Sequence, residues 1–232
     1  MNAAGGTISM LVGTVLLRLW ATGIYRRYVR VGMGPWLAIA GVAVLVLGGT
    51  TLIRSLRHGH VEDAHGHGHG GGGEERMGWL LLAPIAALLL VAPPTLGSYG
   101  VDRGSPVDIK AGNRIFAALP SASRPTPLTL LEFSQRAGDH AGASMAAVTV
   151  ELTGFVAAAD LGAGFRLARY QIACCAADAA PVVVRIVNME GPQPARDQWV
   201  TVTGTFHPGG SVFPELAVTA LAVAPTPEDP YE

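Results

Sequence analysis

One stretch of this chain, residues 35–53, contains no charged residue and constrains the fold more than any other feature. It is long enough to cross the hydrocarbon core of a bilayer as a helix, which takes about 20 mostly apolar residues. Arg54 and Arg57 follow it directly. Backbone polar groups inside a membrane must be bonded internally, so a segment of this kind is expected to be a transmembrane helix.

Two further apolar stretches are predicted to span the membrane, residues 77–96 and about 3–25. The first of the three spans contains Arg18, whose side chain lies close enough to the end to extend toward the interface. A cleaved signal peptide is the competing interpretation of the N-terminus, because residues 8–17 have the length of an h-region. No Lys or Arg precedes that run, so we favour a retained span.

The orientation of these spans stays open. Each of the two short loops carries three arginines, so the positive-inside rule gives a tie. Basic residues after the third span would favour a cytoplasmic C-terminal part, but long domains are translocated largely regardless of charge. We expect a multi-pass protein of the cell membrane and prefer an extracytoplasmic C-terminal domain. The loop arginines are Arg26, Arg27 and Arg30, then Arg54, Arg57 and Arg76.

A histidine-rich loop, residues 58–76, lies between the second and third predicted spans. Imidazole suits transition metals such as zinc, and alternation with Gly gives a loop that can wrap a cation loosely. Such a loop suits capture or sensing better than catalysis. A solvated Gly/His linker with no ligand role is the open alternative. The candidate ligands are His58, His60, His65, His67 and His69, with Glu62 and Asp63 as further donors.

Composition separates the predicted membrane region, residues 1–97, from the rest. Half of the 232 residues are apolar and only 14% are charged, which is too apolar for an ordinary water-soluble domain. The apolar dominance ends near Gly97, and a Gly/Ser/Pro-rich linker is predicted over residues 98–127. The formal net charge of −1 offers no basic surface, so we expect no nucleic-acid partner.

A soluble domain is predicted over residues 128–232, beginning with a short helix. Thr129 and Glu132 have the spacing of a capping box, which predicts a helix from Leu130 to about Ala137 that Gly138 can end. From Ala147 the pattern changes to period two, with apolar and polar residues on opposite faces.

Four more strands are predicted after that one, at residues 165–173, 182–187, 199–206 and 216–223. Five short strands in so few residues favour a small closed barrel. Gly154 and Gly204 each follow an alternating run, where Gly permits the bulge that bends a strand around a small barrel. The predicted fold class is a membrane α-helical N-terminal part with three transmembrane helices and a C-terminal all-β OB-like barrel with a short helix.

Cys174, Cys175 and Asp178 form the second group of candidate functional residues. Two thiols can simply pack, since Cys is often buried. They can instead form a metal or redox site, or a strained vicinal disulfide. Adjacent cysteines on a regular strand point to opposite faces and cannot both bind one metal unless the chain bends there.

The chain resembles the YcgQ-like family of permease subunits over nearly its whole length. Its most specific likeness is the Cys-x-Ala-Asp block at Cys175, Ala177 and Asp178. The order of spans and histidine-rich loop fits as well. Further matching positions are Tyr28-Val29, Met33-Gly34-Pro35, residues 93–98, Arg103-Gly104, residues 169–173 and residues 227–231.

The resemblance implies a protein that works beside a separate, larger multi-span permease. Members with a histidine-rich loop in the same place strengthen the metal hypothesis, and the family supplies no established catalytic residue. Cys174 stands where relatives can have another residue. An essential thiol is therefore expected at Cys175 rather than Cys174, and a disulfide between them is disfavoured.

Three functions remain at this stage. The first is an accessory subunit of a permease that takes part in transition-metal handling, with a permease and the lipid bilayer as partners. The second is a membrane-tethered metal-binding or thiol-redox protein acting through Cys175 and Asp178, and the third is a structural anchor. The sequence contains no Gly-x-Ser-x-Gly, Walker or Rossmann motif, so we expect no enzyme.

Overall fold

The computed structural model describes residues 3–57, 96–104, 116–120, 123–159, 164–209 and 212–232. The chain divides into two compact units, Met1–Pro94 and Thr95–Glu232. The predicted third span, residues 77–96, lies outside the described residues except for Leu96, and the histidine-rich loop lies wholly outside them.

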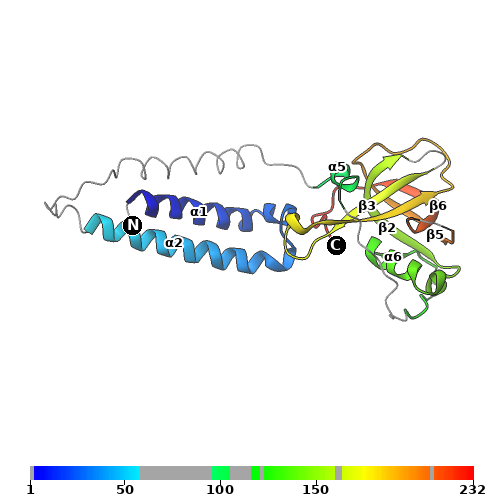
Figure 1. Ribbon diagram of the computed structural model, residues 1–232, viewed down its shortest axis with the longest axis horizontal. Helices are drawn as coiled ribbons and strands as arrows, with labels where there is room; N and C mark the ends of the chain where they lie inside the picture. Colours follow the sequence, from blue (N-terminus) through cyan, green and yellow to red (C-terminus); the bar gives the residue numbers. More distant parts are fainter. Residues whose placement is uncertain (1–2, 58–95, 105–115, 121–122, 160–163, 210–211) are drawn as a thin grey trace. The chain divides into compact units, whose positions relative to one another are not determined.

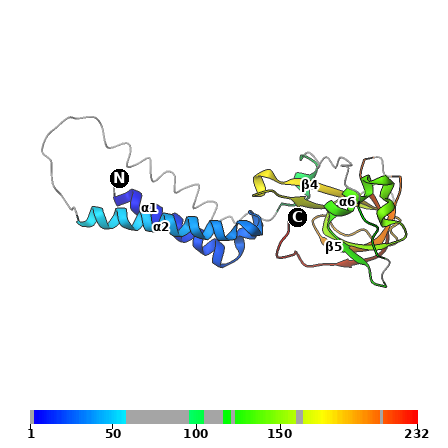
Figure 2. The same ribbon diagram turned by 90° about the horizontal axis from the view of Figure 1, so that it is seen from below.

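Two antiparallel helices, α1 (Ala3–Ala21) and α2 (Gly34–Arg57), make up the described part of the first unit. Figure 1 shows them side by side, in blue and cyan, and the view in Figure 2 agrees. Two short 3-10 helices, η1 (Ile24–Arg27) and η2 (Val31–Met33), connect them. The predicted spans at residues 3–25 and 35–53 therefore correspond to helices.

Glycines line the contact between α1 and α2. A Cβ atom added at Gly48 would lie 2.9 Å from the Gly6 carbonyl oxygen, and one added at Gly13 would lie 2.9 Å from the Gly41 carbonyl oxygen. Such contacts require the two backbones to approach closely, as small residues allow in membrane helix pairs. We call α1 and α2 the helix pair. Their backbones pack closely against each other at these glycines.

The segment Val31–Arg57 is long and apolar enough to cross a membrane, and the apolar stretch Gly5–Ala21 of α1 is shorter than that criterion requires. Only 11% of the most apolar part of Val31–Arg57 is buried in the described structure, unlike the core helix of a water-soluble protein. These helices are consistent with a membrane anchor or a signal segment.

The second unit contains a mixed six-stranded sheet. We call the described residues of this whole unit the β domain. The sheet order is β1-β2-β3-β4-β6-β5, with an additional pairing between β2 and β5. The pairs β1–β2 and β4–β6 are parallel, whereas the others are antiparallel. The strands are β1 (Thr126–Leu128), β2 (Thr149–Ala159), β3 (Phe165–Gln171), β4 (Ala180–Val187), β5 (Trp199–His207) and β6 (Glu215–Val223).

All five predicted strands are present, and β1 was not predicted. Val148, directly before β2, and Val150 and Leu152 on it are buried as the alternation requires. The register between β5 and β6 shifts at Gly204, where a Cβ atom would collide with the Ala217 carbonyl oxygen. A bulge is therefore present beside Gly204, with the extra residue Thr219 on the partner strand β6. The register of β2 against β3, in contrast, shifts between Val156 and Ala158 and not at Gly154.

Helix α6 (Leu130–Gly138) begins where the capping pattern predicted. The Thr129 hydroxyl accepts a hydrogen bond from the Glu132 amide at 3.0 Å. The Glu132 carboxylate accepts from Arg136 in the next turn. Phe133 faces the sheet and is fully buried with Phe165 in the main core. One short segment, α5 (Ser98–Val101), and two 3-10 turns, η3 (His140–Met145) and η4 (Ala176–Asp178), complete the β domain.

Candidate functional site

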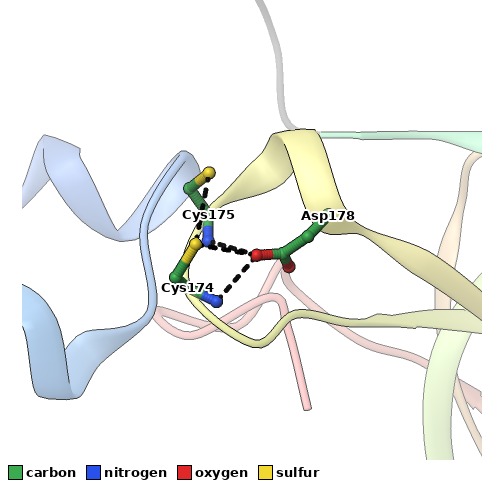
Figure 3. A group of neighbouring side chains, drawn as sticks. All are labelled: Cys174, Cys175 and Asp178. Atoms are coloured by element: carbon green, nitrogen blue, oxygen red, sulfur yellow. Dashed lines mark hydrogen bonds between the residues drawn. The ribbon is translucent and has the colours of Figure 1, made fainter.

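Cys174, Cys175 and Asp178 lie in the connection between β3 and β4, which we call the cysteine turn (residues 172–179). Strand β3 ends at Gln171 and β4 begins at Ala180, and these two residues pair with each other. Between them the chain turns through η4. This bend brings three side chains from five consecutive positions together, as Figure 3 shows.

The Asp178 carboxylate organises the turn. Its Oδ1 atom accepts a hydrogen bond from the amide of Ala173 at 2.8 Å. Its Oδ2 atom accepts from the amides of Cys174 and Cys175 at 2.9 and 3.2 Å, and from the Cys174 thiol at 2.8 Å. These four hydrogen bonds close the turn around the carboxylate.

The two sulfur atoms lie on the same side of the bend. The Sγ atoms of Cys174 and Cys175 are 3.7 Å apart, and both cysteines are free thiols. One ligand atom from each of Cys174, Cys175 and Asp178 lies within 4.8 Å of the others. The bend thus removes the geometric obstacle that a regular strand would impose on two adjacent cysteines.

Hydrogen bonding sets the protonation of this group. The thiol of Cys174, followed by the amides of Cys174 and Ala173, donates to Asp178 and lowers the pKa of that carboxyl. The same contact with Asp178, with a smaller contribution from Cys175, raises the pKa of Cys174 to about 11. Cys174 is accordingly a thiol at neutral pH, because a thiolate beside a carboxylate is disfavoured.

The C-terminal tail, residues 227–232, braces the strand that leads into the turn. Glu232 and Tyr170 are joined by a backbone hydrogen bond of 2.9 Å, and Ile172 donates to the Glu232 carbonyl at 3.2 Å. The Arg169 guanidinium donates to the carbonyls of Asp229 and Tyr231, at 2.7 and 3.3 Å. Two blocks far apart in the sequence therefore meet directly before the cysteine turn.

The buried Glu232 side chain links this tail to α6. Its two carboxylate oxygens accept hydrogen bonds from the amides of Leu130 and Leu131, at 2.8 and 2.9 Å. These amides belong to the first turn of α6, whose N–H groups lack partners within the helix. Burial raises the pKa of Glu232, and the two amides oppose that shift.

A polar network holds residues 96–104 against the same strands. Asp197 accepts a hydrogen bond from the Ser98 amide at 2.6 Å, and the Tyr170 hydroxyl donates to the Gly97 carbonyl at 2.8 Å. Burial, with a smaller contribution from Asp197, raises the pKa of Tyr170 to about 12. Asp102 forms ion pairs with Arg166 and Arg196. The beginning of the predicted linker is thus packed on the β domain.

The structure places the predicted site residues in two groups. Cys174, Cys175 and Asp178 come together in the cysteine turn, whereas the five candidate histidines of the loop lie outside the described residues. Sequence reasoning missed the roles of Arg169 and Glu232. The tail was noticed only as a matching motif, and no periodicity or spacing pointed to its pairing with β3.

Comparison with known families gives one match. Residues 140–232 match the family model described as the DUF1980 C-terminal domain. The matched segment contains the cysteine turn and the tail that braces it. No curated protein matches this chain.

Proposed function

We propose that this chain is an integral membrane accessory subunit of a permease, without enzymatic activity of its own, and that it takes part in transition-metal handling. The observation that carries the proposal is the construction of the helix pair. Its inner face contains Gly6, Gly13, Gly41 and Gly48, against which the facing helix packs closely, and its outer face is apolar. This combination suits a lipid environment, where packing rather than water exclusion holds helices together.

The outer face of α2 supports a membrane location. Large apolar side chains stand exposed along its length, which would be unfavourable in water but matches the hydrocarbon of a bilayer. Arginines follow the apolar part of α2 and can lie in the interface. The exposed apolar residues of α2 are Trp36, Ile39, Val42, Val46, Leu47, Ile53 and Leu56.

The helix pair is a poor conduction path, which supports a role beside another protein. Neither α1 nor α2 contains an Asp or Glu residue. Transporters mark their paths with ionisable groups inside the membrane and with interrupted helices. A separate multi-span permease would supply the path, and the predicted third span would complete the anchor of this chain.

The family match covers the part of the second unit on which the resemblance rests. The cysteine turn and the tail fall within the matched residues 140–232 and are the blocks on which the resemblance to YcgQ-like permease subunits is most specific. The histidine-rich loop at residues 58–76 would add a capture segment for metal ions. We place the β domain on the extracytoplasmic side.

We further infer that the sheet is an OB-like small barrel. Each of β2, β3, β4, β5 and β6 pairs with two others of this set, so the pairings run in a ring. The register shifts of β5 against β6 at Thr203/Gly204, and of β2 against β3 between Val156 and Ala158, are irregularities of the kind that bend strands around a small barrel.

A membrane-tethered thiol-redox protein is the second candidate function. The 3.7 Å between the Cys174 and Cys175 sulfurs favours it, because two thiols this close can be oxidised together. The raised pKa of Cys174 opposes both thiol–disulfide exchange and metal binding, since each requires the thiolate, so it does not separate the two functions.

Co-purification tests the accessory role. The tagged full-length chain, extracted from its native membranes with a mild detergent, is expected to run as a complex with a multi-span membrane protein in a fixed ratio. Identification of that partner by mass spectrometry and its capture in the reverse direction complete the test. A chain that purifies only as a solitary monomer, in detergents that preserve other membrane complexes, contradicts the proposal.

A further inference from the structure

We propose that the cysteine turn binds one thiophilic divalent metal ion of the zinc type through Cys174 Sγ, Cys175 Sγ and Asp178 Oδ2. The three side chains come from five consecutive residues, and their ligand atoms lie within 4.8 Å of one another. This assignment concerns the turn alone. It holds or fails whether or not the chain associates with a permease.

The spacing of the two sulfurs fits a shared ion. Two thiolates bound to one tetrahedral zinc ion, each at about 2.3 Å, lie about 3.8 Å apart. The Sγ atoms of Cys174 and Cys175 are 3.7 Å apart in the turn. Both sulfurs can therefore reach one ion without refolding of the backbone.

The Asp178 carboxylate supplies the third ligand in place of a hydrogen bond. Its Oδ2 atom now accepts the thiol proton of Cys174 over a distance of 2.8 Å between the sulfur and oxygen atoms. When Cys174 loses that proton, a lone pair of Oδ2 on the side of the sulfur becomes available to a metal ion. The amide donors of Ala173, Cys174 and Cys175 keep the carboxylate in place, as outer-shell groups do at metal sites.

Binding exchanges two thiol protons for the metal ion, and nothing is oxidised or reduced. Two S–H bonds break, two sulfur–metal bonds form, and both protons pass to water. The carboxylate is ionised before and after binding, so the turn with its ion carries a net charge of about −1 from these ligands and a divalent metal.

This donor set selects the class of ion. Thiolates favour zinc and copper(I), whereas carboxylates and carbonyls favour magnesium and calcium. Two sulfurs exclude the hard cations, and the carboxylate oxygen is a poor ligand for copper(I). Zinc accepts both donor types.

The turn is built for reversible binding. Cys174 and Asp178 are exposed, and Cys175 is half-buried, so an ion can enter and leave from solvent. Three protein ligands leave the fourth tetrahedral position for water or an incoming donor, unlike the closed four-ligand sites that stabilise folds. The hydrogen bonds to Asp178 already close the turn. We therefore expect a bound ion to exchange with solvent.

Cobalt(II) is the probe that tests this site in the reduced full-length chain in detergent. Thiolate ligands give cobalt an intense sulfur-to-metal charge-transfer band, which ions bound to the histidine-rich loop do not give. We expect this band to saturate at one cobalt per chain and to disappear when Zn²⁺ is added. No such band in the reduced chain, or saturation at one cobalt per two chains, would overturn the proposal.

Two variants test the ligands, and a third is their control. Cys175→Ser keeps a hydroxyl at the N-cap position of η4 but removes one thiolate, so it should abolish the band. This loss is larger than the about 10- to 100-fold weakening of metal affinity that removal of an outer-shell group causes. Asp178→Asn should weaken cobalt binding by at least about 10-fold. His140→Ala, at an exposed histidine outside the turn, is the matched control and should change nothing.

Folding of the turn is checked separately from binding. Amide hydrogen exchange at residues 173–179 shows whether Asp178→Asn keeps the turn closed. If it opens, Cys175→Ser decides, because the bonds to Asp178 use the Cys175 amide and not its sulfur. A band that Cys175→Ser leaves unchanged, or binding that Asp178→Asn leaves unchanged in a closed turn, contradicts the three-ligand site.

Discussion

In the helix pair, α1 and α2 meet through glycines such as Gly6 and Gly48, whereas the β domain encloses large side chains such as Phe133 and Phe165. The two units are therefore sensitive to opposite changes. Added atoms should separate the helices, and removed atoms should destabilise the β domain. The difference is expected if the helix pair lies in a bilayer, as proposed, because lipid gives no hydrophobic gain for burying a side chain between helices and water does.

Removal of a core side chain from the β domain should have the largest effect. Phe133→Ala deletes a fully buried ring that packs between α6 and the sheet, so the free energy of unfolding should fall by about 3–5 kcal/mol. Hydrogen exchange of the β-domain amides in denaturant measures this loss. Val212→Ala, at a side chain 78% exposed, should change stability by less than about 0.5 kcal/mol.

Addition of a side chain to the helix contact should come next. Gly48→Leu places Cβ 2.9 Å from the Gly6 carbonyl oxygen, so the helix pair should lose roughly 1–3 kcal/mol. The neighbouring Gly49→Leu is the control, because nothing lies within 4 Å of its Cβ position. Circular dichroism during titration with a denaturing detergent compares the two. Equal losses in both variants would show that glycine contacts do not hold the helices.

The tail offers a polar test of the β domain. Glu232→Gln replaces one acceptor oxygen by an amide group that faces the N–H donors of Leu130 and Leu131, which should cost about 1–3 kcal/mol. The same exchange measurement applies, with Glu190→Gln at an exposed site as control. Undiminished protection of the α6 amides would show that the tail does not stabilise the helix start.

The smallest expected effect on stability lies at the cysteine turn, where the informative quantity is reactivity. The S–H···O bond to Asp178 stabilises the thiol form of Cys174. Its contribution to stability is fully present below the ordinary thiol pKa and is lost as the pH rises through about 11. Cys175→Ser removes the smaller contribution of Cys175 and leaves that of Asp178, so the alkylation rate of Cys174 should keep rising above the ordinary thiol pKa of about 8.5. An inflection near the ordinary thiol pKa of about 8.5 would contradict this contact.

Sequence periodicity predicted the start of β2 well because buried and half-buried residues alternate there. Val150 and Leu152 alternate with half-buried polar residues, so the period of two was visible. Strand β1 was missed because its three residues, Thr126–Leu128, are too short to show a period and contain Pro127. Thr129 marked the start of α6 because its hydroxyl acts on the local backbone.

The site was less predictable because its geometry depends on contacts that spacing does not encode. Cys174 and Cys175 were recognised as candidates, but only the bend after Gln171 brings their sulfurs together. The pairing of Glu232 with Ile172 joins positions 60 residues apart, and neither carries a local signature for it. Long-range contacts of this kind follow from the complete fold.

The central claim is that a helix pair in the bilayer carries a β domain whose cysteine turn faces water. Membrane fractionation with thiol labelling tests it most directly, because Cys174 and Cys175 are the only two cysteines in the chain. The chain should stay with the membranes after alkaline carbonate extraction, and a membrane-impermeant maleimide should label intact cells if the β domain is extracytoplasmic. Release of the chain by carbonate, or cysteines that react only after denaturation of permeabilised cells, would contradict the account.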